Sequence, residues 1–456
     1  MKIGVISTRR DVFSKEAAKS CKRELLKFLK EQNLFQVIDI EDINEEGLLF
    51  QEKDVQSIVS KMRAAHVDGV MFVHCNFGSE DLVGKIAAAL EVPVLLWGPR
   101  DDAPLADGCR TRDTQCGLFA AGKVLRRFGV TFTYLENSRI SDSVFAQGFK
   151  DFAAVCGVVS SFRHLRILQL GTRPASFWSV MCNEGELLEK FGIQIVPVSL
   201  LEFTDRVKNK LKVPEKLKET LSQLEKTMDV SAVPEKKLQL LASLKETMKE
   251  LCADTGSSCA AIQCWNALKD DLGIMPCAVN GLMAEEGIPV VCETDIHGAV
   301  TAILLQAAVQ YATPVFFADL TVRHPENDNA ELLWHCGNFP PSLAREDAKK
   351  VLGKHFIFPD HLLGTGEWEL KRGDITICRF DGDHGDYRLL VGEGRSVAGP
   401  RTRGTYVWFE VDDWKRWERK LVEGPYVHHC AGAYGHCAGI LEEACRYIPN
   451  LNVERA

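Results

Sequence analysis

Short apolar runs alternate with amphipathic stretches over the first part of the chain. Strand-like apolar runs occupy residues 2–7, 35–40, 69–74 and 92–97. The helical spacing of apolar positions predicts helices over 15–32, 55–65 and 82–90. Repeated strand–helix units of this kind are typical of a parallel sheet covered by helices. The pattern therefore predicts an N-terminal α/β domain over residues 1–128.

A second series of alternating patterns follows. Strands are predicted over 130–135, 165–170 and 193–198, with helices over 144–155 and 185–191. Residues 206–251 form two Lys/Glu-rich helical segments separated at Pro234, which we expect to be solvated helices on the sheet domain. Strands return from Cys259. We interpret residues 129–350 as a central α/β domain.

The pattern changes after about residue 351. Short runs at 374–379, 387–392 and 405–410 are separated by Gly and Asp turns, which is typical of antiparallel strands. A smaller, β-rich and barrel-like C-terminal domain is expected over 351–456. The predicted fold class is thus α/β, with two Rossmann-like or flavodoxin-like parallel-sheet domains followed by the β-rich domain.

Composition narrows the class of protein. The 456 residues are 46% hydrophobic and 26% charged, as in ordinary folded proteins, and the net charge of −8 gives no support for nucleic acid or anionic lipid as a partner. The N-terminus lacks the regions of a signal peptide, and no apolar stretch reaches spanning length. We therefore expect a cytoplasmic protein without a membrane partner. Neither a dinucleotide fingerprint nor a P-loop occurs, so a nucleotide cofactor is not indicated.

The 16 cysteines are scattered, and many lie inside apolar runs. We expect reduced, packed thiols. Clusters at 335–336, 428–430 and 436–437 combine His with Cys and keep structural zinc as an alternative, although no Cys-x-x-Cys pair supports it.

Two carboxylates end two buried-looking strands, at Glu293 after 289–292 and at Asp319 after 314–318. A helical crossover at 299–311 separates them, so adjacent parallel strands would bring both acids to one ligand crevice, within reach of a shared cation. Asp295 and His297 lie directly before the predicted helix, where they can cap it.

Three of the chain's 12 histidines, His428, His429 and His436, lie in a Gly-rich loop over 424–436. Two carboxylates and an imidazole form a hard, oxygen-rich ligand set, which suits Mn²⁺ or Mg²⁺, with Co²⁺ as a further candidate. Such an ion with open positions binds vicinal oxygens of a polyol and polarises a carbonyl.

These segments resemble a known family. Residues 293–298 (ETDIHG), 317–319 (FAD), 335–338 (HCGN) and 428–429 (HH) are similar, in order and spacing, to the L-fucose isomerase and L-arabinose isomerase superfamily. The chain looks like a divergent, fucose isomerase-like member. The resemblance implies a ketol isomerase, an intramolecular oxidoreductase that interconverts an aldose and its ketose through an enediol with a divalent metal, usually Mn²⁺.

The resemblance also implies roles for individual residues. Glu293 and Asp319 would be metal ligands and the acid/base pair that moves a proton between C1 and C2, and His429 would be the third ligand. His428 is the alternative to His429, and His335 resembles an extra ligand of the arabinose branch. Asp at 319 is the choice of the fucose branch, so we expect the substrate to be a small sugar that is neither fucose nor arabinose, with deoxy and otherwise modified sugars included.

Sugar contacts are expected from Gln263, Trp265 and Asn280, which flank a strand before Glu293, although ordinary strand and turn roles fit them equally well. Arg9 and Asn76 occupy crevice ends of N-terminal strands. By resemblance, they would cover the active site of a neighbouring subunit in a homo-trimer or homo-hexamer. The competing hypotheses are a non-catalytic sugar-binding or sensing protein and an epimerase that uses the same metal site.

Overall fold

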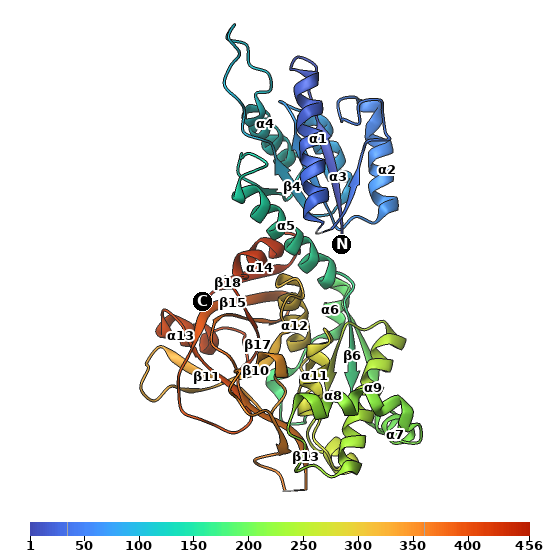
Figure 1. The fold of residues 1–456 in the computed structure, drawn as a ribbon, viewed down its shortest axis with the longest axis vertical. Coiled ribbons are helices and arrows are strands. Elements are labelled where there is room, and N and C mark those ends of the chain that lie inside the picture. The colour runs from blue at the N-terminus through green and yellow to red at the C-terminus, as the bar shows by residue number, and fades with distance from the viewer. Residues whose placement is uncertain (34, 360) are drawn as a thin grey trace. The chain divides into compact units, whose positions relative to one another are not determined.

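The computed structural model describes residues 1–33, 35–359 and 361–456, and the chain divides into two units (Figure 1). The sheet of the first unit has five parallel strands. The unit covers Met1–Ser160, and its strand order is β2-β1-β3-β4-β5. The strands are β1 (Lys2–Thr8), β2 (Gln36–Asp39), β3 (Gly69–His74), β4 (Val94–Trp97) and β5 (Thr133–Tyr134). The helices are η1 (Glu52–Asp54), α1 (Lys15–Gln32), α2 (Val55–Ala65), α3 (Glu80–Leu90), α4 (Thr114–Arg127) and α5 (Ser143–Phe162). This order is that of a flavodoxin-like sheet.

Successive side chains of each strand point to opposite faces of this sheet, and helices cover both faces. Val70 and Phe72 of β3 pack against α2, α3 and α4, whereas Met71 and Val73 pack against α1 and α5. Because every residue of β3 is buried, the strand is apolar throughout, as a central parallel strand must be.

A second parallel sheet opens the second unit, which covers Ser161–Ala456. Its strand order is β7-β6-β8-β9. The strands are β6 (Arg166–Leu170), β7 (Gln194–Val198), β8 (Cys259–Ile262) and β9 (Val290–Val291). The helices around it are η2 (Trp178–Val180), α6 (Glu184–Phe191), α7 (Leu200–Lys210), η3 (Pro214–Leu217), α8 (Lys218–Thr227), α9 (Glu235–Thr255), α10 (Ala267–Leu272) and α11 (Cys277–Glu285). The two predicted parallel-sheet α/β parts are confirmed.

The prediction of two solvated helices over 206–251 was wrong in one respect. The region folds into parts of α7 and α9 with η3 and α8 between them, and α9 is largely buried. Leu241, Leu244 and Met248 are fully enclosed in the core, and Lys245 is only 2% exposed because it pairs with Glu286. The Lys/Glu-rich composition of this region therefore did not indicate that α9 is buried on several sides.

The rest of the second unit is a large, mostly antiparallel sheet. Its strands are β10 (Phe316–Arg323), β11 (Ala330–His335), β12 (Val351–Lys354), β13 (Leu363–Glu369), β14 (Asp374–Asp383), β15 (Asp386–Val397), β16 (Thr405–Glu410), β17 (His429–Tyr434) and β18 (Leu451–Arg455). The order is β12-β13-β16-β11-β10-β17-β14-β15-β18, and an additional pairing of β15 with β16 closes it into a barrel. The β-rich, barrel-like part is thus confirmed. It begins with β10 at Phe316, whereas the sequence pattern placed its start at about residue 351.

One buried helix connects the parallel sheet to the barrel. The remaining helices of the unit are α12 (Ile296–Ala308), η4 (Pro341–Leu343), α13 (Trp414–Glu423) and α14 (Ala438–Cys445). All residues of α12 are buried, and the helix lies against β14 and β17. Since α12 follows β9 directly, it fixes the turn after β9 against the barrel, and this turn contains Glu293.

All 16 cysteines lie in the described residues, and none of them forms a disulfide. Most are buried, as predicted, whereas Cys109 and Cys116 are exposed. Among the helices of the described part of the chain, none has both the length and the apolar character that crossing a bilayer requires.

Candidate active site

Asp319 and His429 lie next to each other on two paired strands of the barrel. In the antiparallel pairing of β10 with β17, Asp319 lies opposite His429, and Nε2 of His429 is 3.5 Å from Oδ1 of Asp319. Side chains alternate along a strand, so Phe316 and Ala318 enter the apolar core while Asp319 lies on the other face. The side chain of Asp319 is 20% exposed, whereas that of His429 is buried.

Glu293 reaches the same place from the turn after β9. Glu293 and Thr294 both have left-handed backbones, with φ of 56° and 55°. For a β-branched residue such as Thr294 this conformation is strained by about 1–2 kcal/mol, and strain of this kind concentrates at functional sites. The turn is held by Thr294 N, which donates to Ile262 O at 3.1 Å. It places Oε2 of the buried Glu293 at 3.8 Å from Nε2 of His429.

The expected origin of this convergence was wrong. The sequence argument placed Glu293 and Asp319 at the ends of adjacent strands of one parallel sheet. Instead, β9 is the edge strand of the parallel sheet, and Asp319 lies within β10 of the barrel, which pairs antiparallel with β11 and β17. The two carboxylates meet because α12 runs along the barrel and joins the two sheets.

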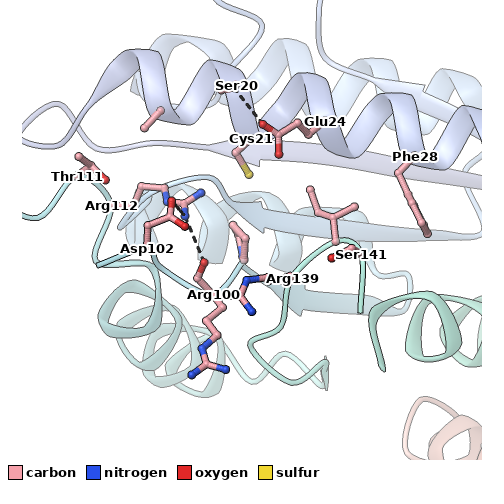
Figure 2. A pocket seen from close by; sticks show the side chains of 13 residues that line it. Ser20, Cys21, Glu24, Phe28, Arg100, Asp102, Thr111, Arg112, Arg139 and Ser141 are labelled. Carbon is pink, nitrogen blue, oxygen red and sulfur yellow. Dashed lines mark hydrogen bonds and ion pairs between the residues drawn. The ribbon is translucent and has the colours of Figure 1, made fainter. Parts of the chain in front are cut away.

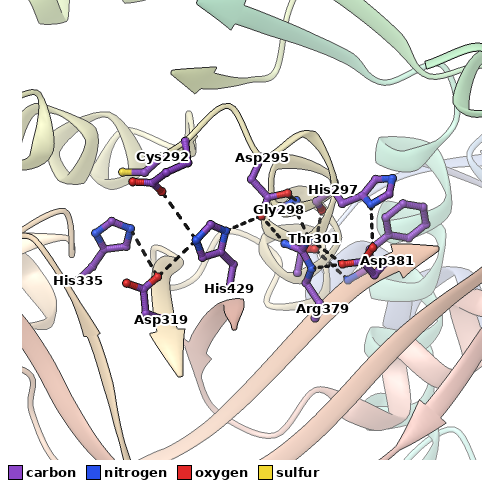
Figure 3. Close-up of polar contacts among 12 residues, drawn as sticks. Cys292, Asp295, His297, Gly298, Thr301, Asp319, His335, Arg379, Asp381 and His429 are labelled. Carbon is purple, nitrogen blue, oxygen red and sulfur yellow. Dashed lines mark hydrogen bonds and ion pairs between the residues drawn. The ribbon is translucent and has the colours of Figure 1, made fainter. Parts of the chain in front are cut away.

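Asp319, His335 and His429 point toward one another (Figure 3), and several of the polar atoms in this space lack hydrogen-bond partners among the described residues. Oε2 of Glu293 and Oδ1 of Asp319 are buried and have no hydrogen-bond partner among the described residues. Burial, with the nearby Cys264 and Asp319, raises the pKa of Glu293 well above its usual value. Buried oxygens of this kind are costly unless they bind a donor or a cation. Two carboxylates and one imidazole that meet at unsatisfied atoms fit a hard divalent cation.

Hydrogen bonding decides which nitrogen of His429 can bind a cation. Its Nδ1 lies 2.8 Å from Oδ2 of Asp295. A carboxylate only accepts, so Nδ1 carries the proton and the lone pair of a neutral ring lies on Nε2. This nitrogen is the one that faces both Glu293 and Asp319.

His335 has the opposite arrangement. Its Nδ1 accepts the backbone N–H of Cys336 at 2.8 Å, so in the neutral ring the proton lies on Nε2, 4.0 Å from Oδ1 of Asp319. Burial lowers the pKa of His335 to about 4, so the ring is neutral near pH 7. This geometry favours His335 as a hydrogen-bond donor to Asp319 or to a bound oxygen, and disfavours it as a metal ligand.

His428 lies beside the site and is less buried than His429. It is exposed, and its ring centroid lies 4.3 Å from that of His429. Ring nitrogens of both histidines and an oxygen of Asp319 lie within 4.8 Å of one another. Of the two rings, His429 is the buried one that faces both carboxylates.

A buried ion-pair network, which sequence reasoning missed, supports His429. Asp295 caps α12 as predicted, since its Oδ1 accepts from Gly298 N at 2.9 Å. Arg379, on β14 and 1% exposed, pairs with both Asp295 and Asp381. Burial would raise the pKa of Asp295, but the charge of Arg379 and the hydrogen bond from His429 hold it well below its usual value. Asp381 in turn lies 3.0 Å from Nδ1 of His297.

One sequence signal could have revealed this network. Arg379 interrupts the apolar run from Ile375 to Phe380, and an arginine on a buried strand needs acidic partners close by. The acids themselves gave a weaker signal, because Asp295 reads as an ordinary helix cap.

The predicted sugar-binding residues have structural partners. Oε1 of Gln263 accepts from Thr172 N at 3.1 Å, and the ring of Trp265 lies 5.9 Å and 5.5 Å from the rings of Phe177 and Phe358. Nδ2 of Asn280, which is 1% exposed, lies 3.6 Å from Sγ of Cys292. Of the three residues, Asn280 thus contacts the neighbour of Glu293 in the chain, Cys292, whereas the contacts of Gln263 and Trp265 lie with other segments.

The two candidates in the first unit are likewise engaged. Arg9 donates from Nε to Oε2 of Glu46 at 2.7 Å, and its guanidinium lies 3.7 Å from the centre of the Phe50 ring. Oδ1 of Asn76 accepts from Arg10 N at 2.8 Å and from Gly78 N at 3.1 Å. Both residues shape the loops at the ends of β1 and β3.

Each unit also contains a polar cavity. One of about 190 Å³ adjoins the Glu293 turn and is lined in part by Thr294, Ile296 and Arg173. Another, of about 500 Å³ in the first unit, is lined by α1 and by loops that contribute Arg100, Arg112 and Arg139 (Figure 2). Neither Arg9 nor Asn76 lines the latter.

Comparisons with known proteins agree with this layout. Residues 4–163 match the model of the fucose/sulfoquinovose isomerase N-terminal domain, and residues 333–454 match that of the L-fucose isomerase C-terminal domain. The chain is 28% identical over 344 residues to the sulfoquinovose isomerase of Alkalicoccus urumqiensis, which covers 75% of each chain. It is 26% identical over 450 residues to that of Priestia megaterium, which covers 96% of each.

Proposed function

The chain belongs to the fucose isomerase-like family and is a sugar aldose–ketose isomerase; from this premise we propose that it acts with a divalent cation held by Glu293, Asp319 and His429. Mn²⁺ is the proposed ion, with Co²⁺ and Mg²⁺ as alternatives. The observation that carries the proposal is that Oε2 of Glu293 and Oδ1 of Asp319, which lack hydrogen-bond partners among the described residues, both face Nε2 of His429, the ring nitrogen that is not bonded to Asp295.

A bound cation would polarise the substrate carbonyl and hold the oxygens on C1 and C2. The carboxylates of Glu293 and Asp319 form the acid/base pair. One of them removes the proton from C2 of the aldose, which gives the enediol once O1 is protonated. Protonation of C1 and loss of the proton from O2 then give the ketose, so no external oxidant is needed. A positioned acid/base pair of this kind typically contributes about 10²–10⁴-fold to the rate.

The relatives suggest a substrate class. Because both are sulfoquinovose isomerases, we propose a 6-deoxy aldose with a substituent at C6, of which sulfoquinovose is the first to test. The cavity beside the Glu293 turn supports this proposal, since it is lined by Arg173, whose guanidinium donates hydrogen bonds to the backbone carbonyls of Pro174 and Ala175. An arginine there would suit an anionic group at C6.

The test is an assay of the purified protein, stripped with a chelator and reloaded with each cation. Sulfoquinovose, L-fucose and L-arabinose would be incubated in deuterated water. Ketose formation, deuterium incorporation at C1 of the ketose and deuterium incorporation at C2 of the re-formed aldose would be followed by NMR. We expect ketose formation with exchange, lost on chelation and restored by Mn²⁺. Isomerisation that continues undiminished without a cation would contradict the metal site.

One variant and one product analysis complete the test. Glu293→Gln is expected to lower the rate by about 10²–10⁴-fold in a folded protein. Isomerisation at the wild-type rate in this variant would refute its acid/base role. Product stereochemistry separates isomerisation from the alternative, epimerisation at C2, which would give a second aldose instead of a ketose.

A further inference from the structure

The two carboxylate oxygens of Glu293 face different chemical surroundings. Oε2 faces Nε2 of His429 at 3.8 Å, on the side of the proposed hard-cation site. Oε1 faces sulfur, since it accepts a hydrogen bond from the thiol of Cys264 at 3.3 Å. Glu293 is thus shared between oxygen and nitrogen groups on one side and thiols on the other.

A second thiol completes a three-donor cluster. The sulfurs of Cys264 and Cys292 and a carboxylate oxygen of Glu293 all lie within 4.8 Å of one another. All three residues are buried, with at most 4% exposure. A sulfur and an oxygen bound to one tetrahedral zinc ion are about 3.5 Å apart, given the usual Zn–S and Zn–O bond lengths. The observed 3.3 Å between Cys264 and Glu293 is close to this spacing.

Two amides support the sulfur of Cys292. Nδ2 of Asn280, on α11, and Nδ2 of Asn338, after β11, each lie 3.6 Å from Sγ of Cys292. Both asparagines are buried, and their Oδ1 atoms have no partner among the described residues. Donors aimed at a sulfur hold it in place, and such partners are typical of the surroundings of a metal ligand.

From this arrangement we propose that Cys264, Cys292 and Oε1 of Glu293 form a second cation site, which takes thiophilic ions such as Zn²⁺ or Cd²⁺. Thiolate ligands select soft ions, whereas the carboxylate–imidazole set on the other side selects hard ones. On binding, each thiol releases its proton to solvent and two sulfur–metal bonds form, without any change of oxidation state.

The site has a consequence for catalysis, which rests on the proposed function. An ion bound to Oε1 withdraws negative charge from Glu293 and fixes the rotation of its carboxylate. Oε2 then becomes a weaker ligand and a weaker base. A soft ion at the thiols therefore inhibits the isomerase.

The direct test is a titration of the full-length, Mn²⁺-loaded protein with Cd²⁺, followed by sulfur-to-cadmium charge-transfer absorption in the ultraviolet. The titration uses a Cys109→Ser, Cys116→Ser background, because these two thiols are exposed. We expect one tight Cd²⁺ per chain in this background. Adding Cys264→Ser or Cys292→Ser should weaken it by roughly tenfold or more, as loss of a ligand does.

Cys252→Ser is the matched control, since this cysteine is buried on α9 and belongs to no such cluster among the described residues. It should leave the titration unchanged. Circular dichroism identifies any variant that does not fold; Cys264→Ala then serves as a second test of the same ligand. Equal Cd²⁺ binding by the background and a folded Cys264 variant would overturn the proposal.

The absorption does not depend on turnover, so it separates this proposal from the proposed function. A protein that binds Cd²⁺ through Cys264 and Cys292 supports the thiol site even if no aldose is converted. An active isomerase without this absorption refutes the thiol site alone. In the active protein, we expect inhibition by Cd²⁺ that a thiol-containing chelator reverses.

Discussion

Nδ1 of His429 donates to Oδ2 of Asp295, 2.8 Å away, and this bond turns the other ring nitrogen toward Glu293 and Asp319. Asp295 also caps α12 and pairs with Arg379, so one carboxylate links the helix, the barrel and the proposed ligand. The position of the imidazole is therefore set by the fold before any ion binds, which is the arrangement that carboxylate–histidine–metal groups use.

This relationship predicts the effect of Asp295→Asn. Asparagine keeps the helix cap, but as a neutral amide it orients and polarises the imidazole less well. We expect Mn²⁺ affinity to fall by about 10–100-fold, measured by Mn²⁺ titration with paramagnetic resonance. Unchanged affinity in a folded variant would show that Asp295 does not position the ligand.

Removal of the buried guanidinium of Arg379 is expected to lower the free energy of unfolding strongly. Arg379→Met leaves Asp295 and Asp381 buried without their cation. Breaking a buried pair in this way typically costs about 3–5 kcal/mol, to be measured by chemical denaturation. Arg388→Met is the control, because Arg388 pairs with Asp386 and Glu454 at the surface, where an ion pair contributes about 0–1 kcal/mol. Equal losses in the two variants would refute this account.

The buried carboxyl group of Glu331, outside the candidate active site, is expected to make the stability of the fold depend on pH. The residue is 5% exposed on β11, and its Oε1 accepts from Nε1 of Trp417 at 2.6 Å. Burial raises the pKa of Glu331 from 4.5 to about 7. The folded state therefore holds a proton that the unfolded state has lost, and the stability from this group falls as pH rises from about 4.5 to 7.

Glu331→Gln removes this dependence, because the amide oxygen still accepts from Trp417 without becoming charged. We expect the variant to be more stable than the wild type at pH 8, by at most about 3 kcal/mol, and the difference to vanish near pH 4. Denaturation at several pH values measures it. A difference that stays constant across this range would contradict the assignment to Glu331.

The sequence predicted which residues meet better than it predicted how they meet. Period-two and helical patterns were sufficient for β1–β4 and α1–α3 of the first unit, because a central strand such as β3 is apolar throughout and each of these helices shows one apolar face. The patterns did not predict α4, and they assigned the segments of β5 and α5 to the second domain, although β5 and most of α5 belong to the first unit. The pattern could not assign β10, since its apolar start reads equally well as a buried parallel strand. Pairing of β10 with β17 depends on contacts between residues more than a hundred positions apart, which no local pattern encodes.

Removal of the cation provides the last prediction. If Glu293, Asp319 and His429 hold the ion, binding stabilises the folded state by about 2.7 kcal/mol at a cation concentration of 100 times Kd. Addition of Mn²⁺ to the chelated protein should therefore raise its melting temperature. Asp319→Asn should abolish most of this increase while relieving the repulsion that Asp319 exerts on the buried carboxyl of Glu293 in the metal-free protein. The variant is thus expected to melt at or above the temperature of the chelated wild type, and a full Mn²⁺ response in Asp319→Asn would exclude Asp319 from the ligand set.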